Sequence, residues 1–138
     1  KAFRHAASCL EQLFLSQIAF DTSFTTGQNA KEFEQMVDQS FSLYQKSGKS
    51  IFMIRNAMML SEMYDCLERY QESANYLLKI ANEIKDSSVI GPLFLEQASY
   101  KFLHMQKYRK FALYMIMAGK SYEKLGLQNY AFNCFTIV

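Results

Sequence analysis

The sequence has few residues that interrupt helices. Its 138 residues include one proline, five glycines and no tryptophan. A β fold with many turns needs more turn-forming residues than this, so the shortage favours long helices. Half of the residues are apolar, among them twelve phenylalanines, nine tyrosines and eight methionines. A chain of this length and composition is expected to bury a core of its own.

Motifs that position catalytic groups are also missing from the sequence. It has no phosphate-binding glycine loop, no HExxH helix and no G-x-S-x-G turn. The stretch "KSGKS" (46–50) contains a glycine and a lysine but follows no predicted strand, so it is interpreted as a connector between helices. We therefore predict that the chain is not an enzyme and uses no cofactor.

Cysteine is scarce, and its spacing suits neither a disulfide framework nor a metal site. Cys9, Cys66 and Cys134 are odd in number and far apart, with only His5 and His104 as further soft ligands. The favoured interpretation is three buried thiols in a reducing compartment.

No uncharged apolar run approaches the ~20 residues that a membrane-spanning helix needs. Residues 1–20 combine a basic start with an apolar middle, but Phe3, Ala7 and Leu10 recur at helical spacing. That spacing predicts an amphipathic helix rather than a signal peptide. Because the sequence begins without methionine and ends in apolar residues, we expect a piece of a longer protein.

The net charge of +2 is unevenly distributed along the chain. Residues 101–138 carry six basic groups and one acidic group, whereas residues 1–100 carry nine basic and twelve acidic groups. The basic third either meets an acidic partner or an anionic surface, or forms a solvated helix face. The aromatic residues fall at core spacing rather than beside the basic groups, so no nucleic-acid partner is expected.

Apolar periodicity and capping signals predict an all-α fold of about seven helices. Asn29 and Glu32 are spaced as a capping box at the start of the second helix. Gly48 and Ser50 are expected to end that helix and to cap the next one, while Gly91 ends a path and Pro92 enters the first turn of a helix. The other expected ranges are about 2–20, 51–67, 70–85, 92–105, 107–125 and from 127 onward.

The stretch "MAGKSYEKLGLQNYAFNCF" (117–135) has the spacing of a tetratricopeptide-type helix pair, in which small residues let two helices approach and an aromatic residue fills the groove. Two earlier stretches repeat this theme, so we predict a single tetratricopeptide-like antiparallel solenoid segment over residues 1–138, in which residues 107–125 serve two pairings. The small, aromatic and turn positions, in chain order, are Ser61, Tyr64, Tyr70 and Ala74, then Ser99, Phe102, Tyr108 and Ala112, and last Gly119, Tyr122, Gly126, Ala131 and Phe135.

Residues 51–138 resemble the TRAPP-complex subunit 8 family, the large subunits of the third TRAPP complex. The resemblance is carried by "MLSEMY" (59–64), "ESANYLLKI" (72–80), "LFLEQA" (93–98), "RKFA" (109–112), "MIMAG" (115–119) and the alanine and cysteine of "YAFNCF" (130–135). The family usually has a few more residues between the "LEQA" helix and "RK" than are present here. Residues 1–50 carry no such resemblance.

The resemblance implies a non-catalytic scaffold in a tethering complex that supports Rab GTPase activation in vesicle traffic and autophagy. Its implied partners are other TRAPP subunits, the remainder of its own chain and, indirectly, a Rab GTPase. The implied location is cytoplasmic, at the periphery of ER–Golgi membranes, with membrane contact only through the complex.

The alternative function is a tetratricopeptide-like adaptor that binds peptides in a concave groove, for which Arg55 and Asn56 are the available polar residues. The residues expected to make protein contacts are Phe132, Phe135, Val138, Lys107, Arg109 and Lys110.

Overall fold

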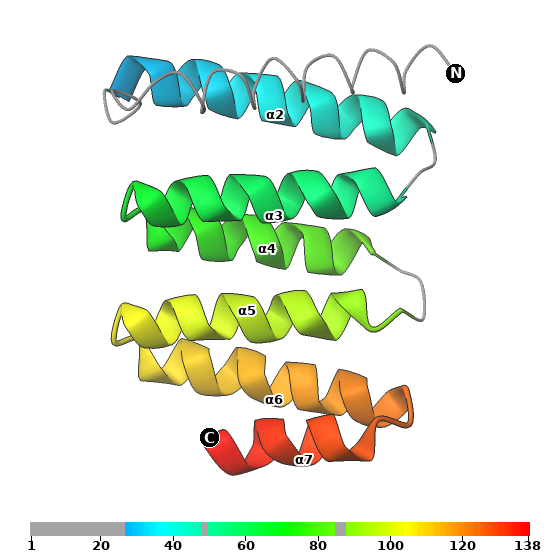
Figure 1. The fold of residues 1–138 in the computed structure, drawn as a ribbon. Coiled ribbons are helices and arrows are strands. Elements are labelled where there is room, and N and C mark those ends of the chain that lie inside the picture. Colours follow the sequence, from blue (N-terminus) through cyan, green and yellow to red (C-terminus); the bar gives the residue numbers. More distant parts are fainter. Residues whose placement is uncertain (1–26, 48–49, 85–87) are drawn as a thin grey trace. The chain divides into compact units, whose positions relative to one another are not determined.

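The computed structural model describes residues 27–47, 50–84 and 88–138, which form six helices and no strand (Figure 1). This part of the chain confirms the all-α fold. The helix expected over residues 2–20, together with Cys9 and Gly48, lies outside the described residues. The helices are α2 (Gly27–Ser47), α3 (Ser50–Cys66), α4 (Tyr70–Glu83), α5 (Ile90–His104), α6 (Tyr108–Lys124) and α7 (Gln128–Ile137).

The chain divides into two compact units, with the boundary between Leu60 and Ser61 inside α3. The single solenoid segment over residues 1–138 stays a prediction, and the two units are described separately.

The first unit has a small core formed by α2 and the first part of α3. Val37, Phe41 and Tyr44 are buried on one side of α2, as their spacing by three and four predicts. Tyr44 stacks on Phe52 of α3, with 5.1 Å between the ring centroids.

Helix α2 begins at Gly27, so the capping box predicted at Asn29 is wrong. Gln28 and Ala30 on either side of Asn29 are compatible with a helix. The helix therefore begins three residues before the start at residue 30 that the capping box predicted. Ser50 is likewise the first residue of α3, whereas the sequence predicted that it caps a helix beginning at 51.

In the second unit, successive helices run antiparallel (Figure 1). Helix α4 packs on α5, α5 on α6, and α6 on α7. Helix α6 therefore contacts both of its neighbours, as the overlapping repeats in the sequence predicted. Its buried residues point toward these two neighbours and are Phe111, Met115, Ala118, Gly119 and Tyr122.

Helices α3, α5 and α6 each end in a turn of the same type. Glu68, Gln106 and Gly126, which follow α3, α5 and α6, all have positive φ angles of 56°, 59° and 77°. At each turn the next amide donates to the carbonyl oxygen five residues earlier, over 2.8 Å after α3, 2.9 Å after α5 and 3.0 Å after α6. This pairing is the Schellman motif, which satisfies carbonyl groups left unpaired at a helix end.

The carbonyl that accepts this bond always belongs to a buried aromatic residue: Tyr64, Phe102 or Tyr122. Three residues before each aromatic lies a buried small residue, which is Ser61, Ser99 or Gly119. These are the small and aromatic positions that the sequence analysis identified, and their burial confirms that they pack between helices.

The small residues predicted on the following helices are buried at Ala74 and Ala131 but not at Ala112. Ser73, Phe111 and Ala131 lie at equal distances after the three turns and are buried, and Ser73 bonds to Ser61 with 2.8 Å between the hydroxyl oxygens. The predicted Ala112 is only half-buried, and Tyr108 is exposed. Phe111 fills the space between α5 and α6 because its ring packs against Tyr100, with 6.3 Å between the centroids.

Helix α5 begins at Ile90, before the predicted boundary. Pro92 occupies its first turn as predicted, where the missing amide proton breaks no helical hydrogen bond. Gly91 was expected to end a path, but it lies inside the same first turn. Gly91 does not have the positive φ angle of a helix-ending glycine, which among the described glycines occurs at Gly126.

We expect Gly119→Leu to lower the free energy of unfolding by ~1–3 kcal/mol. A Cβ atom at Gly119 would lie 2.6 Å from the Phe135 ring, so any side chain there displaces that ring. The measurement is thermal or urea unfolding of Gly119→Leu beside Lys120→Leu, which adds the same side chain at an exposed neighbour. The penalty should shrink in the double variant Gly119→Leu/Phe135→Ala. Equal stability of Gly119→Leu and the parent would contradict the close approach of α6 and α7.

Candidate interaction surface

The predicted basic residues lie together at the start of α6. Lys107 directly precedes the helix, Arg109 and Lys110 lie in its first turn, and all three are exposed. Lys107 donates a hydrogen bond to the side-chain oxygen of Gln71 on α4. The ammonium of Lys110 lies 5.3 Å from the centre of the Phe102 ring, a favourable cation–π geometry. We call Lys107, Arg109 and Lys110 the basic end.

The predicted apolar residues lie on α7. Phe132 is 67% exposed, Phe135 41% and Val138 51%. Helix α7 fully buries only two residues, Ala131 and Cys134. The Phe135 ring lies against Gly119 of α6, but it remains partly exposed like the other large apolar side chains of the helix. Tyr130 and Ile137 are exposed as well. We call the five residues Tyr130, Phe132, Phe135, Ile137 and Val138 the α7 apolar surface.

The basic end and the α7 apolar surface are separate. The two helices are antiparallel, and α7 begins at the turn where α6 ends, but α6 has 17 residues and α7 has 10. At a rise of 1.5 Å per residue, α7 ends roughly 10 Å before the first turn of α6 (Figure 1). The sequence could identify both groups but not this separation, which depends on the length of α7.

Between α5, α6 and α7 the structure places a small polar cluster that the sequence analysis missed. The Tyr122 hydroxyl donates to the Glu96 carboxylate over 3.0 Å. Burial and this carboxylate raise the pKa of Tyr122 and the pKa of the Cys134 thiol. Both groups therefore stay protonated at neutral pH, and the cluster serves packing rather than nucleophilic chemistry. No local motif marks it, because its members come from three helices.

The three cysteines were predicted to be buried. The prediction is confirmed for Cys134, but Cys66 is exposed at the end of α3. It lies in the last turn of that helix, next to the Schellman turn, where the chain leaves the core. In the described residues, no three histidine, cysteine or acidic side chains lie close enough to hold a metal ion.

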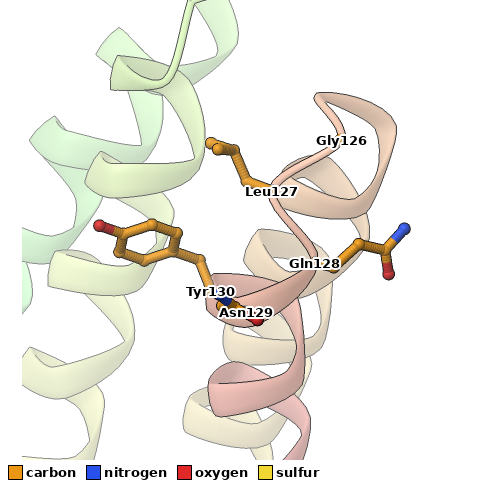
Figure 2. A pocket seen from close by; sticks show the side chains of 5 residues that line it. All are labelled: Gly126, Leu127, Gln128, Asn129 and Tyr130. Atoms are coloured by element: carbon orange, nitrogen blue, oxygen red, sulfur yellow. The ribbon is translucent and has the colours of Figure 1, made fainter.

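The turn between α6 and α7 borders a recess of about 190 Å³ (Figure 2). Leu127 and Tyr130 extend from one side of this segment, and Gln128 points the opposite way (Figure 2). All five residues that line the recess are consecutive, from Gly126 to Tyr130. The recess brings no acid, base and nucleophile together from different elements, which is what a catalytic site requires. Within the described part of the chain, no helix has the length and apolar character to span a membrane.

Among curated proteins, the chain is similar to trafficking protein particle complex subunit 8 of Homo sapiens, with 30% identity over 102 residues. The similar region is 72% of this chain but spans only 7% of the human protein's length. No family model matches the chain. No solved structure matches it. The similarity agrees with the resemblance carried by residues 51–138 and relates the chain to a subunit of a trafficking complex.

The α7 apolar surface should make the 138-residue chain self-associate. Burying one large apolar side chain is worth ~1.5–3 kcal/mol, so five exposed ones favour any contact that covers them. Light scattering over a concentration series should show a rising mass, and Phe132→Asp/Phe135→Asp should keep the mass at the monomer value. The control is Ile51→Asp, because Ile51 is 69% exposed on α3. A parent chain that stays monomeric at every concentration would contradict this expectation.

Proposed function

We propose that the chain is a non-catalytic scaffold segment of a TRAPP-type tethering complex, which supports Rab GTPase activation in vesicle trafficking and autophagy. The observation that carries the proposal is the 30% identity with human trafficking protein particle complex subunit 8. The helices add a physical reason, because a stack of helix pairs offers long faces for protein contacts.

In this proposal, the α7 apolar surface packs against the remainder of the same polypeptide, and the basic end contacts another TRAPP subunit. Exposed large apolar residues that adjoin a packed helix pair are the surface that a further helix covers in repeat proteins. The Rab GTPase is an indirect partner, reached through the assembled complex. The protein acts in the cytoplasm at the periphery of ER–Golgi membranes, and it meets the membrane only through the complex.

The polar residues near the first unit's core favour the scaffold over the peptide-binding adaptor. An adaptor needs Asn56 on an open face, but Asn56 is buried and donates to the Ser40 hydroxyl over 2.6 Å. Arg55 is exposed. Of the two polar residues that the adaptor alternative relies on, Asn56 is therefore used inside the unit.

The proposal is tested by affinity purification of the intact protein from cells, with TRAPP subunits measured by quantitative mass spectrometry. The parent protein should recover TRAPP subunits, and the variant Phe132→Asp/Phe135→Asp should recover several-fold less. The control Ile51→Asp/Met58→Asp, which adds the same two negative charges at exposed positions on α3, should recover as much as the parent. Absence of TRAPP subunits from the parent sample would contradict the function. Full recovery with the double variant would contradict the role of the α7 apolar surface.

A further inference from the structure

A third surface of the molecule lies between α4 and α6. It is separate from the basic end and from the α7 apolar surface. The two helices meet near their starts, where Lys107 donates to Gln71. Toward their other ends they border a cavity of about 510 Å³ whose floor includes α5. The helix residues that line this cavity are Ala81, Asn82, Gly91, Pro92, Leu95, Met117, Ser121 and Lys124.

The cavity has an apolar interior and a basic rim. Pro92 and Leu95 are buried on α5, while Met117 on α6 is 41% exposed and reachable from solvent. Lys124 is the charged residue among those that line the cavity in the described part of the chain. Half-buried Glu83 follows Asn82 but does not line the cavity.

Exposed lysines on the neighbouring faces of α4 and α6 add to the positive charge of Lys124. On α6, the exposed residues Leu113, Met117, Lys120 and Lys124 are spaced by four, three and four, so they lie on one face. On α4, the exposed residues are Asn75, Lys79 and Asn82, again on one face. Glu72, in the first turn of α4, has a side chain that is 45% exposed but forms an ion pair with Arg69. On α6 the exposed carboxylate is that of Glu123.

We propose that the cavity between α4 and α6, which we call the α4–α6 groove, binds an acidic segment of a partner protein. One apolar side chain of that segment inserts beside Met117. Complementary charge attracts such a segment and orients it. The Asn82 amide supplies donors and an acceptor, and the Ser121 hydroxyl, which donates to the Met117 carbonyl oxygen, supplies a further acceptor. These groups match a peptide backbone. A recess that accepts a side chain favours a peptide over a lipid surface, which contacts projecting residues. This inference does not rest on the proposed membership in a TRAPP complex.

The test is selection of random 12-residue peptides displayed on phage against the full chain, followed by affinity measurements with synthetic copies. The selected peptides should carry net negative charge and at least one large apolar residue, and raising the salt concentration should weaken their binding. Lys124→Glu and Lys120→Glu should each weaken binding at least tenfold. The control Lys31→Glu makes the same charge change on exposed α2 and should change affinity less than twofold. Circular dichroism should show the parent's helix content in all variants.

Selection of neutral or basic peptides, or acidic peptides that bind Lys124→Glu as tightly as the parent, would overturn the proposal. Vesicles of phosphatidylcholine with and without phosphatidylserine provide the second arm. Binding to the anionic vesicles that Lys124→Glu abolishes, with no acidic peptide selected, would assign the face to membrane and also overturn it. Selection of no peptide, together with binding to neither kind of vesicle, would also overturn the proposal.

Discussion

The Schellman turn that ends α3, α5 and α6 is the constraint on which the second unit depends. Each turn directs the chain back onto the helix that it has just left, and the carbonyl it satisfies belongs to a buried aromatic residue. The hydrogen bond and the aromatic contact therefore fix the same residue, Tyr64, Phe102 or Tyr122. A left-handed residue other than glycine costs ~1–2 kcal/mol. Glu68 and Gln106 keep that conformation because the packing of two helices offsets the cost.

Much of this arrangement is predictable from the sequence, because the pairs Ser61–Tyr64, Ser99–Phe102 and Gly119–Tyr122 recur with one spacing. Gly126 also marks its turn. Glu68 and Gln106 carry no such signal, since nothing in a glutamate or a glutamine indicates a positive φ. The choice of Phe111 rather than Ala112 as the buried residue depends on how two helices are offset, which local periodicity does not determine.

The candidate surfaces were also only partly predictable from the sequence. The chemistry of Phe132, Phe135 and the basic end is visible in the sequence, but their exposure depends on which neighbours cover them. Lys101, one of the six basic residues of the last third, is paired with Asp65, 36 residues earlier, across packed helices. The α7 apolar surface exists because α7 fully buries only Ala131 and Cys134 against α6 and leaves its large apolar residues partly exposed. This exposed apolar area on α7 supports the proposal that a further protein segment covers the helix.

We propose that protein covers the α7 apolar surface in the assembled complex. Hydroxyl-radical footprinting with mass spectrometry measures this directly, by comparing oxidation of Phe132 and Phe135 in the 138-residue chain and in the intact protein purified with its partners. We expect both residues to be oxidised at high dilution of the chain and to be protected several-fold in the complex. Met58, which is 51% exposed on α3, serves as an internal reference. Equal oxidation of Phe132 in the two samples would contradict the proposal.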